Sequence, residues 1–378
     1  MRSVSRRLIA GVAIVVGALA PIVAVTPASA AAPHHVITAA GSDTTEAVMR
    51  AVLANFNKSA ANTNHDGTAN IPAVPGTRGY KVAADANCAV RTYAVVGSPP
   101  AMYTAPNGSG AGKTALADPT NLANGCIDVV RSSAGPAAGE SSAFRYFGYA
   151  KDAVSWAAFQ SNTHAPATLT KGDIKNIYGC NVTDWAQVGG TSGPIQRYLP
   201  QAGSGTLKFF ITNILDNNDP STIAGVGCPA VKRVEENKGD QIDAADRTTA
   251  ILPYSAGQWI AQANRVITDH RAGATVRSIT VNNVAQNPVG PKVHGKYTPN
   301  ARVINGPFPG ARVVYNVLDT DSVDYAWALK AVGFDSANVA TGVKSPLCTG
   351  KLATVLKTYG FLPLAADSHG ITCQVETP

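Results

Sequence analysis

The stretch Ile195–Leu215, IQRYLPQAGSGTLKFFITNIL, is the part of the sequence from which the fold can be argued most directly. Its first five residues predict a short strand, which Pro200 ends because proline has no N–H for a sheet ladder. The Gly-Ser-Gly sequence at 203–205 permits a tight turn with close backbone approach. From residue 207 onward, apolar residues recur at i, i+3, i+4, i+7 and i+8, the spacing of an amphipathic helix. We therefore predict a strand, a tight turn and a helix.

The turn at 203–205 is a candidate binding site for a small anion. The first turn of a helix has unpaired N–H groups and the positive end of the helix dipole, which can bind an anion without a charged side chain. Ser204 and Thr206 would add hydroxyl donors. Serine and threonine are also common helix caps, so an ordinary capped helix explains the same residues. The candidate ligand-binding residues of this turn are Gly203, Ser204, Gly205 and Thr206.

Two further polar turns follow predicted strands earlier in the chain. A first strand leads into Gly41–Glu46 and then a helix, with Asp43 and Glu46 at the spacing of a capping box. A buried strand at 126–130 ends in a second polar turn at 131–136. The candidate ligand-binding residues of these turns are Ser42, Asp43, Thr44, Thr45, Arg131, Ser132 and Ser133.

Composition and motifs argue against several classes of function. Charged residues make up 15% of the 378-residue chain and no run of Lys or Arg occurs, so nothing points to nucleic acid. The sequence NGSGAGKT imitates a phosphate loop, but Asn107 stands where the motif needs its first glycine, and we predict a flexible loop. A hydrolase with Ser204 as nucleophile is a weaker alternative, because the flanking glycines and a recognisable acid–base histidine are missing. We expect no catalytic residues, no cofactor and no metal site.

Residues 1–30 have the pattern of a cleavable export signal. A basic start is followed by an apolar run and by Ala28-Ser29-Ala30, a small-residue cleavage site. Because no cysteine lies near that site, we expect no lipid anchor, and the protein should be secreted, extracellular or periplasmic. The chain has 6 cysteines, an even number that predicts disulfides in an exported protein, although six allow fifteen pairings.

Other segments predict the rest of the fold. Residues 250–255, 276–281 and 313–318 predict strands. Residues 325–332 and 352–356 predict helices, and Thr170 to Asp173 predicts the cap of another. The charged segment 231–250 is expected to be helical near 241–247.

Four pieces of the sequence carry a resemblance to a known family. They are GSDTT at 41–45, the turn at 128–136, LTKGDIKNIYGCNVTDWAQVGG at 169–190 and AGSGT at 202–206. In content and order they resemble the phosphate-binding class of periplasmic solute-binding proteins. The third piece is the most specific, because it resembles the family's helix, tyrosine and tryptophan pattern before a Gly-Gly turn. The resemblance spans nearly the whole mature chain.

The resemblance implies the type 2 periplasmic-binding-protein fold. Such a protein has two Rossmann-like α/β lobes with mixed sheets, joined by a two-segment hinge, and binds its ligand between the lobes. The first lobe would comprise residues 33–154 plus 253–378, and the second residues 155–252. The aromatic segment 144–156 would connect them. Sequential disulfides would each lie within one lobe, as Cys88–Cys126, Cys180–Cys228 and Cys348–Cys373.

The function implied is capture of phosphate or a related small oxyanion, for delivery to an ABC-type permease by a monomer without a catalytic step. The alternative is a divergent member that binds cell-wall polymer or a protein partner. Matched by position, Thr44 and its neighbours, Ser132, and Ser204 with Gly205 and Thr206 would donate to the anion. The family's acceptor aspartate falls on Ser133 and its arginine on Pro200. Arg131 or Arg197 would then supply the positive charge, and Asp43 the acceptor.

Overall fold

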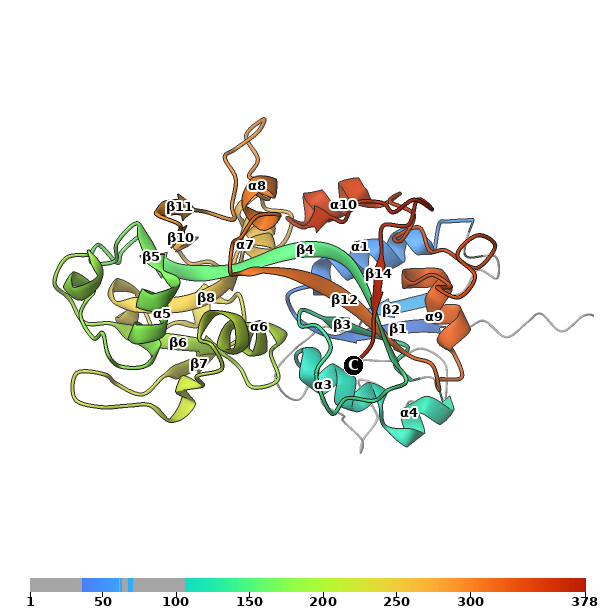
Figure 1. Cartoon of the computed structure of the whole chain (residues 1–378), viewed down its shortest axis with the longest axis horizontal. Coiled ribbons are helices and arrows are strands. Elements are labelled where there is room, and N and C mark those ends of the chain that lie inside the picture. The colour runs from blue at the N-terminus through green and yellow to red at the C-terminus, as the bar shows by residue number, and fades with distance from the viewer. Residues whose placement is uncertain (1–35, 61, 63–66, 71–105, 125) are drawn as a thin grey trace, which may run out of the picture. The chain divides into compact units, whose positions relative to one another are not determined.

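A computed structural model describes residues 36–60, 62, 67–70, 106–124 and 126–378 of the chain, shown in Figure 1. The predicted export signal at residues 1–30 lies outside the described residues. Contacts group His34–Pro378 into one compact unit. Across the described ranges, no helix is both long and apolar enough to cross a membrane.

Most strands of the described chain belong to one mixed sheet. Pairing is parallel between β1 and its neighbours β2 and β3, and between β6 and its neighbours β7 and β8. The central strands β12 and β4 run antiparallel to each other, so the α/β fold with mixed sheets is confirmed. In order along the sheet, the strands are β2 (Gly67–Asn70), β1 (Val36–Gly41), β3 (Val129–Ser132), β12 (Ala311–Asp319), β4 (Phe144–Phe159), β8 (Ala250–Ser255), β6 (Gln196–Pro200) and β7 (Lys232–Val234).

The long strand β4 joins the two parallel groups of this sheet. Its first part pairs with β12, and Val154 to Ala157 pair with β8. Nearly every β4 residue is buried, as expected for a strand covered on both faces. The aromatic segment predicted as a connection is therefore itself a central strand (Figure 1). Three short strands also pair with β4, namely β9 (Ala274–Val276), β13 (Leu362–Pro363) and β14 (Gln374–Glu376). A separate sheet contains β11 (Val284–Gln286), β10 (Ser278–Val281) and β5 (Thr168–Thr170).

Helices follow several of the strands, and some have the predicted ends. The helix α5 begins with a capping box in which Thr170 accepts from the Asp173 N–H at 3.0 Å, as predicted. After the 203–205 turn, α6 continues into a π-helical turn at Phe210–Ile214, so the predicted helix is of mixed type. Of its apolar residues, Phe210, Ile214 and Leu215 are buried, and Leu207 and Ile211 are partly buried. The helices are α1 (Glu46–Phe56), α3 (Ser109–Leu116), α4 (Pro119–Asn124), α5 (Lys171–Tyr178), α6 (Gly205–Phe209), α7 (Ala256–Ala263), α8 (Ala301–Ile304), α9 (Tyr325–Val332) and α10 (Ala353–Thr358).

The prediction of a flexible loop at 107–114 is wrong, because residues 109–114 lie in the helix α3. Its glycines allow close packing: a Cβ at Gly112 would lie 2.9 Å from a Val130 methyl and 3.0 Å from the Gly41 Cα. Lys113 is buried and forms an ion pair with Glu140. Close approach to β1 and β3 therefore explains the glycines better than backbone mobility does.

Two further local predictions are wrong. The capping box at Asp43 and Glu46 is absent: Thr45 is the N-cap residue of α1 and makes no side-chain cap bond. The segment near 241–247 forms two short 3₁₀ turns at Gly239–Gln241 and Asp246–Thr248 instead of an α-helix. Asp246 in this segment forms an ion pair with Lys232 of β7 at 2.6 Å, so tertiary contacts override helix propensity.

Two large apolar clusters support the sheet. One packs α1, α9 and α10 against the strands β1, β3, β12 and the first part of β4. The other packs α5 and the π-helical turn against the second part of β4, and includes Trp156 and Trp185, whose ring centroids are 6.1 Å apart. Ile279, Ile304 and Phe308 also lie in this second cluster. The lobe boundaries at 154/155 and 252/253 stay a prediction.

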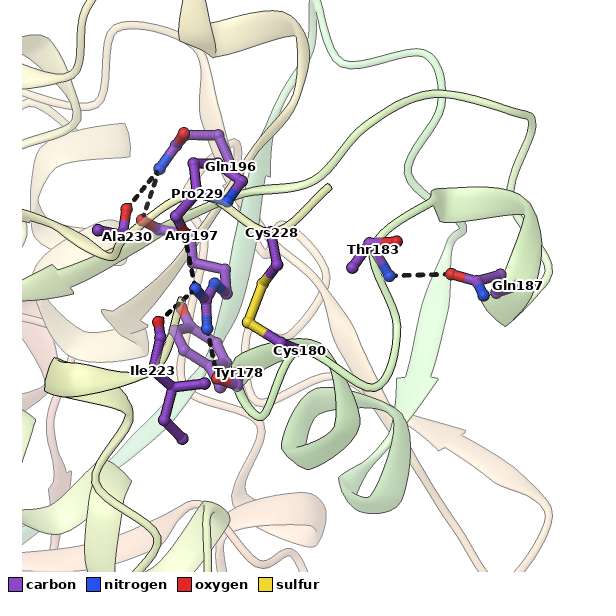
Figure 2. Close-up of a disulfide and its surroundings, with 10 residues drawn as sticks. All are labelled: Tyr178, Cys180, Thr183, Gln187, Gln196, Arg197, Ile223, Cys228, Pro229 and Ala230. Atoms are coloured by element: carbon purple, nitrogen blue, oxygen red, sulfur yellow. Dashed lines mark hydrogen bonds between the residues drawn. A yellow bond between two sulfur atoms is a disulfide. The ribbon is translucent and has the colours of Figure 1, made fainter. Parts of the chain in front are cut away.

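Two of the three predicted disulfides are confirmed. Cys180 is bonded to Cys228, as Figure 2 shows, and Cys348 is bonded to Cys373. The third predicted bridge, Cys88–Cys126, lies outside the described residues because Cys88 does.

Candidate functional site

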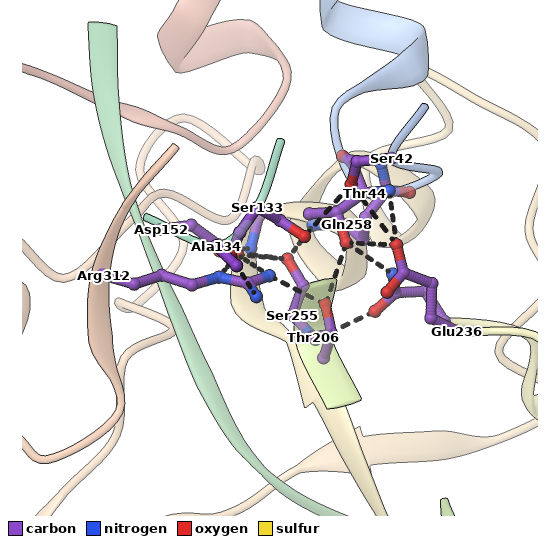
Figure 3. Close-up of polar contacts among 12 residues, drawn as sticks. Ser42, Thr44, Ser133, Ala134, Asp152, Thr206, Glu236, Ser255, Gln258 and Arg312 are labelled. Atoms are coloured by element: carbon purple, nitrogen blue, oxygen red, sulfur yellow. Dashed lines mark hydrogen bonds and ion pairs between the residues drawn. The ribbon is translucent and has the colours of Figure 1, made fainter. Parts of the chain in front are cut away.

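Polar side chains gather where the parallel strands end. The strands β1 and β3 are parallel neighbours, and so are β7, β6 and β8, so within each group the carboxyl ends share one edge. Open α/β sheets bind ligands at this edge. The turns that follow these strands contribute hydroxyl, amide and carboxylate groups to one buried hydrogen-bonded network (Figure 3).

The centre of the network is the carboxylate of Glu236, which lies two residues after β7 and is 1% exposed. Its Oε1 accepts hydrogen bonds from the Thr44 N–H and the Thr44 hydroxyl, both at 2.9 Å. The Ser42 hydroxyl lies 3.5 Å from the same oxygen. The other oxygen, Oε2, accepts from the Ser204 hydroxyl. Donors from two predicted turns therefore meet at one anionic group.

Further hydroxyls extend the network. The Thr206 and Thr44 hydroxyl oxygens are 3.1 Å apart, and the Ser42 hydroxyl donates to the Ser133 oxygen at 3.1 Å. These side chains are all buried. The third predicted turn thus enters the network through Ser133, whose hydroxyl oxygen accepts from Ser42 of the first turn.

A buried ion pair borders these hydroxyls. Arg312 on β12 is the cross-strand partner of Asp152 on β4, and its Nη2 donates to the Asp152 carboxylate at 2.7 Å. The two side chains are 2% and 0% exposed. The same guanidinium donates to the Ser133 carbonyl and to the Thr206 hydroxyl, each at 3.0 Å. Arg312 therefore places positive charge directly beside the network.

Residues at the start of α7 also donate hydrogen bonds to members of the network. Ser255 donates to the Asp152 carboxylate at 2.9 Å, and the Gln258 amide donates to the Thr44 carbonyl at 2.5 Å. Asn237 donates to the Thr44 hydroxyl at 3.3 Å. Thr44 is thus held by backbone and side-chain contacts from three different segments.

Glycine in the 203–205 turn permits close contact with its neighbours. A Cβ at Gly205 would lie 2.3 Å from the Ser109 hydroxyl and 2.5 Å from the Ser133 hydroxyl. Gly203 has a φ of 84°, in the left-handed region that favours glycine. Its carbonyl accepts from the Gly110 N–H of α3 at 3.1 Å. These glycines therefore let the turn pack tightly against α3 and the β3 turn.

Several predicted site residues have other roles in the structure. The Ser132 hydroxyl donates to the Ala134 carbonyl at 2.6 Å, within its own turn, so Ser133 takes the place expected for Ser132. Thr45 is buried at the start of α1. Arg131 donates to the carbonyls of Ala39, Gly41 and Ser42, and burial lowers the pKa of its guanidinium to about 10.

Arg197 also binds backbone carbonyls and does not enter the network. As Figure 2 shows, it donates to the carbonyls of Tyr178, Ile223 and Pro229, beside the Cys180–Cys228 disulfide. Arg197 therefore links the segments that carry these three carbonyls. The positive charge at the network comes instead from Arg312, which the sequence prediction missed.

Asp43 borders a pocket next to the network. This pocket has a volume of about 520 Å³, and its lining also includes Asn237, Lys238 and Gln258. Desolvation raises the pKa of the Asp43 carboxyl well above its ordinary value, and the nearby negative charge of Glu236 raises it further. Asp43 is therefore an acidic residue beside the network, and the ionised form of its carboxyl is disfavoured.

Sequence signals for the missed residues exist but are weak. Glu236 follows β7, a three-residue strand in a segment that was expected to be partly helical. If that strand had been recognised, Glu236 would have been a candidate, because ligands bind at the carboxyl ends of strands in open α/β sheets. Asp152 follows Lys151 on β4, and Arg312 shares β12 with Asp319, so the strand sequences alone do not say which charges pair. Only the strand register, in which Arg312 is opposite Asp152, indicates a buried ion pair.

The geometry suits binding of a small anion better than catalysis. The Ser204 hydroxyl contacts a carboxylate, whereas a nucleophilic serine needs a base such as histidine. Within the described part of the chain, no group of three or more His, Cys, Asp or Glu side chains could hold a metal ion. What the network does provide is a set of neutral donors converging on negative charge.

Comparisons with known proteins agree with this fold. A family model described as the PBP superfamily domain matches residues 26–331. An ABC-type phosphate transport receptor from Vibrio cholerae is 16% identical, with a TM-score of 0.50 over 87% of this chain and 99% of the receptor. A Clostridium perfringens protein, described as a phosphate ABC transporter substrate-binding protein with bound phosphate, is 13% identical, with a TM-score of 0.51 over 88% of this chain and 100% of its own. A comparison with curated protein sequences found no match.

Proposed function

Because the chain belongs to the family of PBP superfamily domains, we propose that it is an exported solute-binding protein that captures phosphate or a related small oxyanion. It carries out no catalytic step. The two structures similar in fold are described as phosphate receptors of ABC transporters, which supports the choice of ligand class.

The observation that carries the proposal is the convergence of Thr44 and Ser204 on one carboxylate. A carboxylate and a phosphate both present oxygen acceptors with negative charge. Each hydrogen bond to such a charged group contributes about 1.5–3 kcal/mol net. Micromolar binding requires about 8 kcal/mol, so four to six donors of this kind are sufficient after some cost of binding.

The proposed ligand-binding residues are those whose polar groups form the network around this carboxylate, together with the arginine that supports them. Thr44 offers an N–H and a hydroxyl, and Arg312 reaches the network through Thr206. The set comprises Ser42, Thr44, Ser133, Ser204, Thr206 and Arg312.

In a cell the protein would act outside the cytoplasm as a monomer and deliver its ligand to a membrane permease. The signal pattern at residues 1–30 supports export. Expression in a bacterial host with N-terminal sequencing of the exported fraction tests this part. We expect a mature chain that begins at Ala31.

Calorimetric titration of the mature protein with phosphate, sulfate and methylphosphonate, with chloride as the control, tests ligand capture. We expect at least one oxyanion to bind and to raise the melting temperature by mass action. Thr44→Val replaces the hydroxyl donor with a methyl group and keeps the shape of the side chain. It should weaken binding by about ten-fold or more, since one such hydrogen bond contributes about 1.5–3 kcal/mol.

The matched control is Ser132→Ala, because the Ser132 hydroxyl bonds within its own turn. This variant should retain the affinity of the wild-type protein within about two-fold. If Ser132→Ala weakens binding as much as Thr44→Val does, the assigned site is wrong. If no oxyanion binds at all, the proposed function fails, and binding of a polymer or protein partner becomes the better explanation.

A further inference from the structure

Glu236 occupies the point at which the proposed anion-binding donors converge. Its carboxylate accepts from the Thr44 N–H, the Thr44 hydroxyl and the Ser204 hydroxyl, and Ser42 is within reach. These are the donors that an external oxyanion would need. Hydroxyl groups have a single hydrogen to donate, so Thr44 and Ser204 cannot donate to Glu236 and to an external anion at the same time.

The hydrogen bonds that lead to Glu236 have a defined direction. The Arg312 guanidinium can only donate, and it donates to the Thr206 hydroxyl at 3.0 Å. The Thr44 hydroxyl gives its hydrogen to Glu236, so in the 3.1 Å contact between the two threonines Thr206 is the donor. The chain therefore runs from a positive guanidinium through two hydroxyls to a negative carboxylate, which is the polarity that an anion-binding site requires.

Glu236 is satisfied by hydrogen bonds from neutral groups. Among the ion pairs of the described residues, none involves Glu236, whereas Asp152 is paired directly with Arg312. Buried charges are normally paired or fully hydrogen-bonded. Glu236 meets this requirement with neutral donors, as a bound oxyanion would.

The backbone around Glu236 is fixed. The Glu236 N–H donates to the Gln201 side chain at 2.8 Å, and the Asn237 carbonyl accepts from the Tyr254 hydroxyl at 2.6 Å. The Asn237 side chain accepts from the Ser255 N–H at 2.9 Å. Withdrawal of the carboxylate from the donors would therefore require rotation of the Glu236 side chain itself.

We propose that Glu236 is an internal competitor that occupies the oxyanion site and must withdraw before an external anion binds. The inference rests on the proposed function and adds to it a residue that sets affinity. The competition lowers the apparent affinity for every oxyanion by the factor that favours the Glu236-bound state. It also disfavours anions too weak to displace a carboxylate.

Titration of the mature protein and its Glu236→Ala variant with phosphate and sulfate tests the proposal. We expect Glu236→Ala to bind at least one of these anions ten-fold or more tightly than the wild-type protein. Glu236→Gln should fall between the two, because its amide oxygen can still accept from Thr44 but its NH₂ group cannot accept from Ser204.

The matched control is Glu235→Gln. Glu235 is the neighbouring residue, and its carboxylate accepts from the Asn107 amide at 3.0 Å, away from the Thr44 and Ser204 hydroxyls. This variant removes the same charge from an adjacent position and should change anion affinity by less than about three-fold. An equal gain in Glu235→Gln and Glu236→Ala would indicate a general charge effect and would overturn the proposal.

Small carboxylates provide a second measurement. Formate or acetate should raise the melting temperature of Glu236→Ala by replacing the missing carboxylate, and should have little effect on the wild-type protein. This readout also shows that the variant is folded.

The outcomes separate the two proposals. If the wild-type protein binds phosphate and Glu236→Ala binds it no more tightly, the internal competitor is refuted and the proposed function stands. If neither protein binds any oxyanion, and carboxylates do not stabilise Glu236→Ala, both proposals fail.

Discussion

Arg197 and Arg312 are both buried arginines on strands, but their guanidinium groups bind different kinds of partner. Arg197 donates to three backbone carbonyls beside a disulfide. Arg312 pairs with the Asp152 carboxylate and also donates to Thr206 in the candidate site. Burial alone therefore does not indicate a binding role for an arginine. The kind of partner indicates the role. An arginine bonded to backbone carbonyls holds loops together, whereas an arginine in an ion pair beside hydroxyl donors contributes positive charge to a site.

The largest expected effect comes from breaking the Arg312 pair. Arg312→Met leaves Asp152 buried without its cation and should lower the free energy of unfolding by about 3–5 kcal/mol. Urea denaturation of the mature protein measures this. The double variant Arg312→Met/Asp152→Asn removes both charges and should recover most of the loss. If the double variant is no more stable than the single one, the ion pair is not the cause.

The disulfide beside Arg197 should contribute next. Cys180→Ser/Cys228→Ser removes the crosslink and should lower the free energy of unfolding by about 2–4 kcal/mol. The bridge joins the segments that carry two of the Arg197 acceptors, the carbonyls of Tyr178 and Pro229. Anion affinity should stay within about two-fold of wild type, and a larger change would mean that this region does contribute to the site.

Replacing Arg197 itself should have a smaller effect on stability. Arg197→Met leaves buried carbonyls without their donor, at a cost of about 1–3 kcal/mol. Combined with loss of the disulfide, the effects should not add, because both hold the same segments together. A double-mutant cycle in urea measures the coupling. Strict additivity would contradict the view that Arg197 and the disulfide act as one structural unit.

The smallest effect is expected at Asp43, whose pKa is raised by desolvation and by Glu236. A carboxyl with a raised folded-state pKa costs stability when ionised. The cost is absent below the pKa of the unfolded chain, about 3.9, and grows as the pH rises toward the folded-state value. Asp43→Asn should therefore be more stable than the wild-type protein at pH 7, with the difference vanishing near pH 4. Denaturation across this pH range checks the sign, and the opposite trend would show that Asp43 is stabilised as an anion.

Local sequence patterns predicted much of the fold. The strand at 250–255 and the helix at 325–332 have the predicted ends, because each is a strongly apolar segment bounded by clear turn or cap residues. The cap at Thr170 was also predicted correctly from local spacing, whereas the Cys180–Cys228 bridge was predicted from the lobe layout that the family resemblance implies. The three polar turns were found from the strand–turn pattern alone, since strand ends and turn residues are local features.

Only the tertiary structure decided which polar groups meet. Whether Ser132 or Ser133 faces the network depends on the conformation of one turn, and Arg312 faces Asp152 through a register between strands 160 residues apart in the sequence. Most of the glycine-rich segment at 107–114 lies in a helix that packs against neighbouring strands, and local composition does not reveal that packing. The sequence determined the elements and the kinds of donor, because these depend on short-range spacing. Packing decided their partners, including the carboxylate of Glu236, because burial of charge depends on groups that are close only in three dimensions.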